Sequence, residues 1–436
     1  MDYKLEDLKV WDERIVELAK KHNLDWFELD YEVVDYHEMI GAMVHHGMPS
    51  MYSHWSFGKS FEQTMNRYNL GAEGLPYELI INSDPSLAYL MRENPLYLQI
   101  LIMAHCVGHS DFFKNNRMFR NTRPESVIQR LRSAKKRIQK YVEDQHIGIE
   151  KVERTLDACQ ALQFQTTKYG QIRRPHDEIR AEYIEEINNS KDDNKYRNFN
   201  LDHYPLEPDY DLLGFIEENA KIPEWKRDII HICREEGQYF WPQIQTKIMN
   251  EGWASMTHYE LCHELDLPGE LHIPIIKMHN AVVRPHIGSI NPYHLGFHLF
   301  QKIKERHGID ECFLAREVCY DASFLSQYLA EEDCVELNLF SYSAKKKSGV
   351  TVDDVSDERG WKEVKEDLIA NVAGGSIPVV HVDELKKDGL LVVRHEHDGR
   401  DLELKHAGEV VDHIKHLWGG SVKFYTIVEE EPWEID

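Results

Sequence analysis

The stretch NPLYLQILIMAHCVGHSDFFKNN, residues 94–116, carries the strongest indication of the fold. Asn94 and Pro95 supply an N-cap and a first-turn proline, and the following residues are apolar on nearly every face up to His105. Such a run predicts a helix that is buried in the core of a helical domain. Its apolar part, Leu96–Ala104, is shorter than the roughly 20 residues that cross a bilayer. We therefore expect a core helix and no membrane span.

Helical periodicity extends on both sides of this stretch, from residue 5 to about residue 330. Apolar residues recur at helical spacing after Leu5, after Pro124 and after Pro223. Two polar stretches, residues 165–180 and 188–211, interrupt the pattern and predict loops. These features favour one large helical domain.

The pattern changes after about residue 330. Residues 397–400 (HDGR) resemble a hairpin turn between LLVVRHEH and DLELKH. The sequence therefore predicts a mainly α protein, with a large helical domain over residues 1–330 and a small α+β domain over residues 331–436. The expected strands cover residues 335–339, 377–382, 390–394 and 422–428, and the expected helices cover residues 361–372 and 408–417.

The charge and cysteine content exclude some classes of protein. The formal net charge of the 436 residues is −25, so we expect no general binding to nucleic acid. Residues 331–436 carry about −12 of it. Such an acidic region usually provides solubility, and a docking surface for an unidentified protein partner is the alternative. The seven cysteines show no regular spacing and argue against a disulfide framework. We expect a cytoplasmic protein.

Common cofactor motifs are missing from the sequence. There is no P-loop, no dinucleotide-binding fingerprint, no kinase signature and no G-x-S-x-G elbow. We therefore predict no nucleotide cofactor, and attention moves to the 25 histidines.

The first histidine motif is His105-x-x-x-His109, inside the buried helix. Residues four apart share a helix face, so both imidazoles can bind one metal ion. The alternative is two core histidines that are bonded to backbone carbonyls. In a zinc-protease motif a glutamate follows the first histidine, whereas Cys106 occupies that position here, so the usual general base is missing.

The second motif is Glu143-x-x-His146, downstream on a basic helix. Glutamate and histidine three apart resemble the unit that di-iron bundles repeat on two helices, but only one unit is apparent. His146 is therefore a further candidate metal ligand, and the alternative is a solvated pair near the end of a helix.

The third motif lies in NEGWASMTH, residues 250–258. Glu251 and His258 are seven apart and lie on one helix face, with Ala254 between them small enough to leave room for a ligand. A buried carboxylate must be paired or coordinating, so a metal site and a buried hydrogen-bonded network both remain open.

A polar stripe, Glu236, Tyr239 and Gln243, lies on the preceding apolar helix. We take Tyr239 and Gln243 as candidates for lining a site.

The segment NEGWAS resembles the helix that supplies the third, glutamate ligand in gluzincin metallopeptidases, in which an HExxH pair supplies the other two ligands. In this chain the two parts are far apart in sequence and the base is absent, so chance and a degenerate relative both remain open as explanations of the likeness.

Two loops are further candidates for lining a site. Arg284, His286, Asn291 and His294 lie among prolines and a glycine in the segment RPHIGSINPYHLGF, and His54 lies in HWSFGK. Purely structural turns are the alternative in both places.

Several long segments carry a family resemblance: HHGMPSMYSHWSFGKSFE, YELIINSDPSLAYLMRENP, AHCVGHSDFFKNN, REEGQYFWPQIQTKIMNEGWAS and RPHIGSINPYHLGF. They cover most of residues 20–300 and resemble the stage V sporulation protein R (SpoVR) family. The resemblance implies a role in endospore formation, specifically in a normal peptidoglycan cortex. Members in non-sporulating bacteria often occur beside a PrkA-type serine protein kinase and a von Willebrand A-like protein. No settled activity comes with the family, and so no catalytic residue is carried over.

Two functional hypotheses follow. In the first, a cytoplasmic sporulation factor binds zinc, iron or manganese through His105, His109, Glu251 and His258, and hydrolyses an amide or ester. Glu143 or Glu236 would then replace the missing base. In the second, the protein is a regulator or scaffold without enzymatic activity. Its acidic domain docks a partner such as a PrkA-type kinase system, and the histidines and glutamates are purely structural.

Overall fold

The chain folds into two compact units, and each unit combines two segments that are distant in sequence. The first contains residues 1–135 and 242–376, and the second contains residues 136–241 and 377–436. The computed structural model describes residues 3–70, 74–166, 174–189, 199–286, 289–337, 339, 342–344, 350–352 and 360–435.

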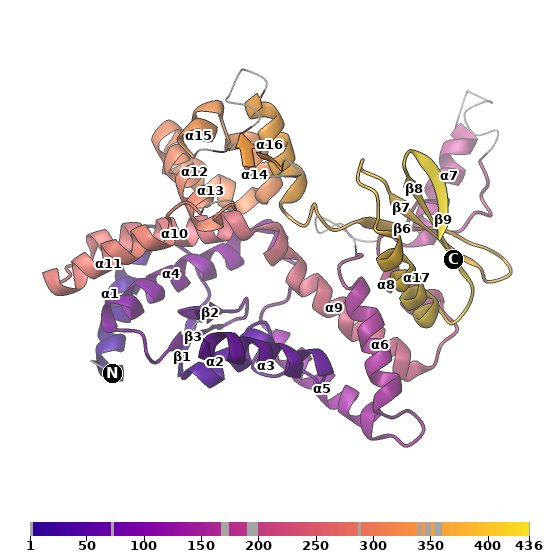
Figure 1. Ribbon diagram of the computed structural model, residues 1–436, viewed down its shortest axis with the longest axis horizontal. Helices are drawn as coiled ribbons and strands as arrows, with labels where there is room; N and C mark the ends of the chain where they lie inside the picture. Colours follow the sequence, from indigo (N-terminus) through magenta and orange to yellow (C-terminus); the bar gives the residue numbers. More distant parts are fainter. Residues whose placement is uncertain are drawn as a thin grey trace. The chain divides into compact units, whose positions relative to one another are not determined.

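The first unit is mainly helical (Figure 1). α5 (Val127–Glu143) begins in this unit and α9 (Glu224–Gln245) ends in it. Its other helices are α1 (Leu5–Lys21), α2 (Tyr36–Val44), α3 (Trp55–Asn69), α4 (Leu96–Asn115), the 3-10 turn η1 (Arg117–Phe119), α10 (Lys247–Glu264), α11 (Gly269–Val282), α12 (Pro292–His307), α13 (Ile309–Val318), α14 (Asp321–Tyr328), α15 (Glu331–Glu336) and α16 (Gly360–Asn371). Its strands are β1 (Leu29–Val34), β2 (Glu78–Ile80), β3 (Ser86–Met91), β4 (Tyr342–Ala344) and β5 (Val350–Val352).

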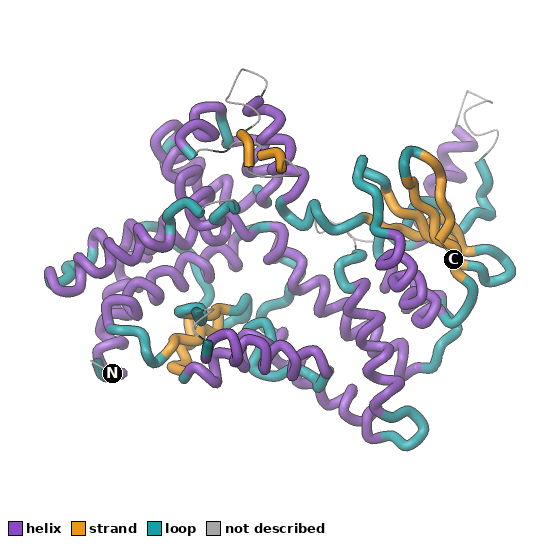
Figure 2. The backbone as a smooth tube through the Cα atoms, viewed as in Figure 1, coloured by secondary structure: helices purple, strands orange, loops and turns teal. Residues whose placement is uncertain are grey.

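The second unit combines helices with one sheet (Figure 2). The sheet order is β6-β7-β8-β9, and only the β7–β8 pair is parallel. α17 packs on β8 and β9. The elements are α6 (Ile149–Leu162), α7 (His176–Asn189), α8 (Leu212–Asn219), β6 (Val379–Leu385), β7 (Leu391–Glu396), α17 (Leu404–Trp418), β8 (Val422–Val428) and β9 (Glu431–Ile435).

The buried helix predicted from residues 94–116 is confirmed as α4. All but four of its residues are buried, and it packs along α10, which packs in turn on α12 (Figure 1). The largest fully buried side chain, Trp253 of α10, belongs to the apolar cluster on one side of these helices. Burial of such a side chain contributes about 2–3 kcal/mol to stability.

A small sheet in the first unit was not predicted, because the sequence was interpreted as helical throughout this region. β1 and β3 pair in parallel, and β2 pairs with β3 antiparallel, in the order β1-β3-β2. β3 (SLAYLM) is buried on both faces except at its last residue, so it lacks the alternation that marks a half-buried strand. The short edge strand β2 carries Glu78 beside α4.

The start of α10 is fixed by a carboxylate from another helix. Thr246, the N-cap residue of α10, makes no side-chain capping bond. Asp321 of α14 instead accepts hydrogen bonds from the backbone N–H groups of Ile248 and Met249, both at 2.9 Å. Burial raises the pKa of Asp321 to about 7, against the effect of these two hydrogen bonds. This contact fixes the first turn of the helix that carries Glu251.

The predicted α+β region is confirmed in its strands from residue 377 onward and in both of its helices, but two predictions were wrong. The strand predicted over residues 335–339 is wrong at its start, because residues up to Glu336 belong to α15, whose first turn Asp333 caps through the N–H of Ala330. Residue 338 lies outside the described residues. Residues 397–400 are not a hairpin turn, because DLELKH leads into α17, which Glu403 caps.

The compact units also divide the chain differently from the predicted boundary at residue 330. α15 and α16 pack together, and α16 packs on α14, all within the first unit. In the second unit α6 packs on α17, and α8 packs on β6. Of the two predicted loops, residues 167–173 and 190–198 lie outside the described residues, and α7 occupies part of the remainder. No helix within the described ranges is long and apolar enough to cross a membrane.

Candidate metal centre

A close approach of two helices brings the predicted ligands together. Gly108 of α4 faces α10, and a Cβ atom placed on it would lie 2.7 Å from Cα of Ala254 and 2.9 Å from Cβ of Thr257. Glycine at this position therefore lets the two backbones approach more closely than any larger residue would permit. Ala254 was expected to leave room for a ligand, but it is fully buried and serves the packing of the helices.

Three of the predicted ligands meet at this crossing. Nε2 of His105 lies 3.8 Å from Oε2 of Glu251, and Nε2 of His109 lies 3.5 Å from the same oxygen. One ligand atom from each of these residues lies within 4.8 Å of the other two. The i,i+4 spacing on α4 and the position of Glu251 on α10 thus produce the convergence that the sequence predicted.

His258 belongs to the cluster, but both of its ring nitrogens contact other histidines. Its Nδ1 lies 2.9 Å from Nδ1 of His105, and its Nε2 lies 2.7 Å from Nδ1 of His279 on α11. His258 therefore supports a ligand from behind, whereas the sequence predicted that it would itself be a ligand. His279, which sequence reasoning missed, extends this chain of imidazoles.

Hydrogen bonds on the far side of each ring orient the two ligand histidines. Nδ1 of His109 lies 2.8 Å from Oδ1 of Asn250, and an amide oxygen only accepts, so this ring nitrogen carries the proton. If His105 donates from Nδ1 to His258, which in turn donates to His279, its own Nε2 is also left free of a proton. Metal-binding histidines are commonly oriented in this way.

The electrostatics of the cluster favour an anionic carboxylate on Glu251 beside a neutral imidazole on His109. Burial alone would raise the pKa of Glu251, but its contacts with His105 and His109 bring the pKa below its usual value. Burial and the neighbouring His105 lower the pKa of His109 to about 4. Burial lowers the pKa of His105 as well, but the carboxylates of Glu251 and Glu78 outweigh it and raise the pKa overall. An anionic carboxylate on Glu251 and a neutral imidazole on His109 can bind a cation without first losing a proton.

Two buried atoms of the cluster have no hydrogen-bond partner among the described residues: Nε2 of His105 and Oε2 of Glu251. Buried polar atoms are almost always paired, so each such atom requires an explanation. Both atoms belong to the same triad. Two imidazoles and one carboxylate are the donor set of several catalytic zinc sites, so the residues present fit a divalent metal.

Two residues of the triad, His105 and Glu251, line a cavity of about 580 Å³, and so does His258. His109 does not occur among the described residues that line it. Figure 1 shows the helices α4, α10 and α11 that contribute to the cavity. Glu78 of β2 also lines this cavity, with Oε1 4.0 Å from Nε2 of His105. Burial raises the pKa of Glu78. Tyr293 of α12 also lines the cavity, and its ring stacks on His105. Sequence reasoning missed Glu78 and Tyr293, because neither shares an element with the ligands.

Cys106, which occupies the position of the usual base, points into the core. Its side chain is fully buried in the apolar cluster with α1 and β3. Burial raises the pKa of its thiol well above the usual value. This residue therefore keeps a neutral thiol and cannot act as the base.

The predicted bases lie elsewhere. Glu143 and Glu236 belong to the second unit, and neither is among the described residues that line the cavity. Glu143 accepts a hydrogen bond from Gln139. α5 ends at Glu143, and His146 lies in the following turn, so the two residues do not form the predicted helical pair.

The other predicted lining residues divide into two groups. Arg284, His286 and Asn291 line the cavity. Asn291 also shapes its wall, because it caps α12 and donates to the backbone oxygens of Val282 and Arg284. Among the described residues that line the cavity, His54, Tyr239, Gln243 and His294 do not occur. His54 instead caps the start of α3.

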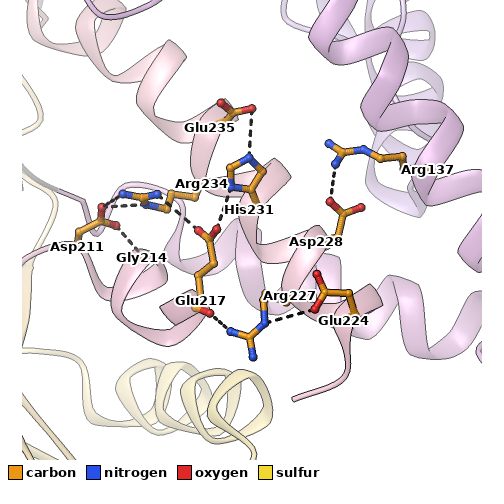
Figure 3. A network of polar contacts seen from close by, with 10 residues as sticks. All are labelled: Arg137, Asp211, Gly214, Glu217, Glu224, Arg227, Asp228, His231, Arg234 and Glu235. Atoms are coloured by element: carbon orange, nitrogen blue, oxygen red, sulfur yellow. Dashed lines mark hydrogen bonds and ion pairs between the residues drawn. The ribbon is translucent and has the colours of Figure 1, made fainter. Parts of the chain in front are cut away.

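The second unit has a polar network of its own (Figure 3). Asp211 caps α8 through the N–H of Gly214 and accepts hydrogen bonds from Arg234. Glu217 of α8 pairs with His231 of α9 at 2.9 Å. These contacts join α8 to α9. The charged residues His231 and Arg234 of α9 therefore hold the two helices together.

Comparisons with known proteins agree with this architecture. The chain is 32% identical over 472 aligned positions to the uncharacterized protein YcgB of Escherichia coli (strain K12), with 97% of this chain and 92% of the relative covered. No solved structure matches the chain. The model of the SpoVR like protein family matches residues 2–377, and the model of the SpoVR-like C-terminal domain matches residues 376–429. The two matches together span nearly the whole sequence, and the chain belongs to the SpoVR family.

Proposed function

We propose that His105, His109 and Glu251 hold a divalent metal ion and that this centre hydrolyses an amide or ester bond. The observation that carries the proposal is the triad of ligand atoms within 4.8 Å of one another, two of whose residues, His105 and Glu251, line a cavity. Three protein ligands beside an open space are typical of catalytic zinc, whereas structural zinc has four protein ligands. Zinc is therefore the first expectation, and iron and manganese are the alternatives.

The surrounding residues supply the remaining requirements of such a reaction. A metal ion in the triad would activate water and polarise a carbonyl group. Glu78, on the cavity wall beside His105, would accept the proton of the attacking water, the role that was predicted for Glu143 or Glu236. The hydroxyl of Tyr293 would donate a hydrogen bond to the carbonyl oxygen as negative charge develops on it.

The biological part of the proposal rests on family membership. The matched family takes its name from SpoVR, and residues 2–377 of the match include both helices of the triad. We propose that the protein acts in the cytoplasm during spore development, on the formation of the peptidoglycan cortex. The amide bonds of peptides are then the first class of substrate to test.

Metal analysis of the full-length protein, purified without an affinity tag, tests the proposal. We expect about one zinc, iron or manganese ion per chain, retained on dialysis. Glu251→Gln and His109→Ala should lose this metal, while circular dichroism shows the helical content unchanged. His263→Ala is the matched control, because this exposed histidine lies on the same helix as Glu251, outside the triad. It should keep the metal.

The competing hypothesis, a regulator that docks a partner through its acidic C-terminal region, makes the opposite prediction. If the histidines and glutamates are only structural, the protein contains no stoichiometric metal and Glu251→Gln changes only its stability. If metal binds but supports no hydrolysis of peptides or cell-wall precursors, the catalytic part of the proposal is wrong and the regulator hypothesis is favoured.

A further inference from the structure

The cavity beside the triad combines polar and apolar lining residues. His105, Glu251 and Glu78 supply polar groups. The apolar groups come from two neighbouring helices, α4 and α11. A cavity of about 580 Å³ is in the range that binds small molecules or one or two residues of a peptide. Its apolar wall consists of Leu98, Leu101, Ile102, Met278, Ala281 and Val282.

Two cations also line this cavity, Lys247 at the start of α10 and Arg284 in the loop after α11. Both residues are exposed, and neither forms an ion pair within the described part of the chain. Two cations without an ion pair at one cavity can attract an anionic group, although the chain as a whole carries a net charge of −25.

We propose that this cavity binds the C-terminal residue of a peptide. Its carboxylate would lie between Lys247 and Arg284, and its apolar side chain would lie against the wall from α4 and α11. The planar guanidinium of Arg284 matches the two oxygens of a carboxylate. The carboxylates of Glu78 and Glu251 in the same cavity disfavour a doubly charged phosphate group. Binding of the peptide does not depend on the proposed function. Only the position of the cleaved bond rests on the proposed metal centre.

The chemistry of cleavage follows from this orientation. Lys247 lies one helical turn before Glu251 on α10, so a carboxylate on the cations would place the last peptide bond near Glu251 and Glu78. Hydrolysis adds one water across that bond: the C–N bond breaks, the hydroxyl goes to the carbonyl carbon, and the one remaining proton goes to the leaving amine through Glu78. The products would be a free apolar amino acid and a peptide shortened by one residue.

Binding without turnover tests the assignment in the full-length protein. The probes are N-acetyl-Ala-Ala-Leu with a free carboxylate and the same tripeptide as its C-terminal amide, measured by isothermal titration calorimetry at low temperature. We expect the free acid to bind at least about tenfold more tightly than the amide, because charge-assisted hydrogen bonds are lost in the amide. This preference should disappear in Arg284→Gln and decrease in Lys247→Gln. Lys277→Gln is the control, because this exposed lysine of α11 does not line the cavity.

The outcomes separate this inference from the proposed function. Equal binding of acid and amide, binding of neither, or unchanged selectivity in Arg284→Gln overturns the inference, even if the triad binds metal. Inorganic phosphate that competes with the acid more strongly than acetate does also overturns it. A preference for the acid in protein that never contains metal supports the inference while the proposed metal centre fails.

Discussion

Replacement of Gly108 by alanine tests whether the helix crossing forms the site. The added Cβ atom would lie 2.7 Å from Cα of Ala254, whereas ordinary contacts of this kind begin at 3.4 Å. The helices α4 and α10 must therefore separate by roughly 0.7 Å, because the nearest atom belongs to a backbone that cannot rotate away. Alanine improves helix propensity by about 1 kcal/mol, but overpacking costs about 1–3 kcal/mol. We expect a loss of stability of up to about 2 kcal/mol.

The effect on metal binding should be larger than the effect on stability. Coordination distances in metal sites vary by only about 0.2 Å, and the displacement separates the two histidines of α4 from Glu251 of α10. We expect zinc affinity to fall about tenfold or more, measured by competition with a chromophoric chelator. Urea unfolding of the same preparations gives the change in stability.

Gly41→Ala is the matched control for this prediction. Gly41 lies inside α2 of the same unit, and an added Cβ atom would meet nothing within 4 Å. This variant should gain up to about 1 kcal/mol in stability and keep its zinc affinity. If Gly108→Ala behaves in the same way as Gly41→Ala, the close approach of α4 and α10 does not determine the geometry of the triad.

Three further predictions concern other contacts. Asp111→Ala should cost about 3–5 kcal/mol in urea unfolding, because it leaves the buried guanidinium of Arg316 without its partner; a cost below about 1 kcal/mol would contradict this. Asn250→Ala should weaken zinc binding about tenfold, because the ring of His109 loses its orientation; unchanged affinity would argue against that role. The hydrogen bond with Glu217 raises the pKa of His231, so this pair stabilises the fold below the usual histidine pKa and loses its effect as pH rises through the raised value. The difference in unfolding free energy between the parent protein and His231→Gln should therefore be larger at about pH 5.5 than at about pH 8.5, and an equal difference would show that the charge is not involved.

The sequence predicts the triad because each part of it lies within one helix. His105 and His109 share a face of α4 because they are four residues apart on one helix. The apolar run before them predicts that this helix is buried. Glu251 follows in the same way from NEGWAS on α10. Only the resemblance to a peptidase helix suggested that α4 and α10 meet. The sequence analysis did not identify Gly108 as the residue that permits their close contact.

The remaining site residues depend on tertiary contacts that spacing does not reveal. Glu78 lies in a three-residue edge strand, and its position beside α4 depends on pairing between β2 and β3. Tyr293 and His279 come from two other helices. A single sequence contains no signal for such neighbours, since the polar residues of these elements look like those of any exposed loop or helix. The bases that were predicted from nearby motifs, Glu143 and Glu236, failed for the same reason.

The central claim is that His105, His109 and Glu251 bind one metal ion, and anomalous X-ray diffraction tests it most directly. Crystals of the zinc-loaded protein should show one strong anomalous peak at the zinc edge. It should lie about 2.0–2.2 Å from Nε2 of both histidines and from a carboxylate oxygen of Glu251. No peak at the triad, or a peak elsewhere on the protein, would contradict the claim.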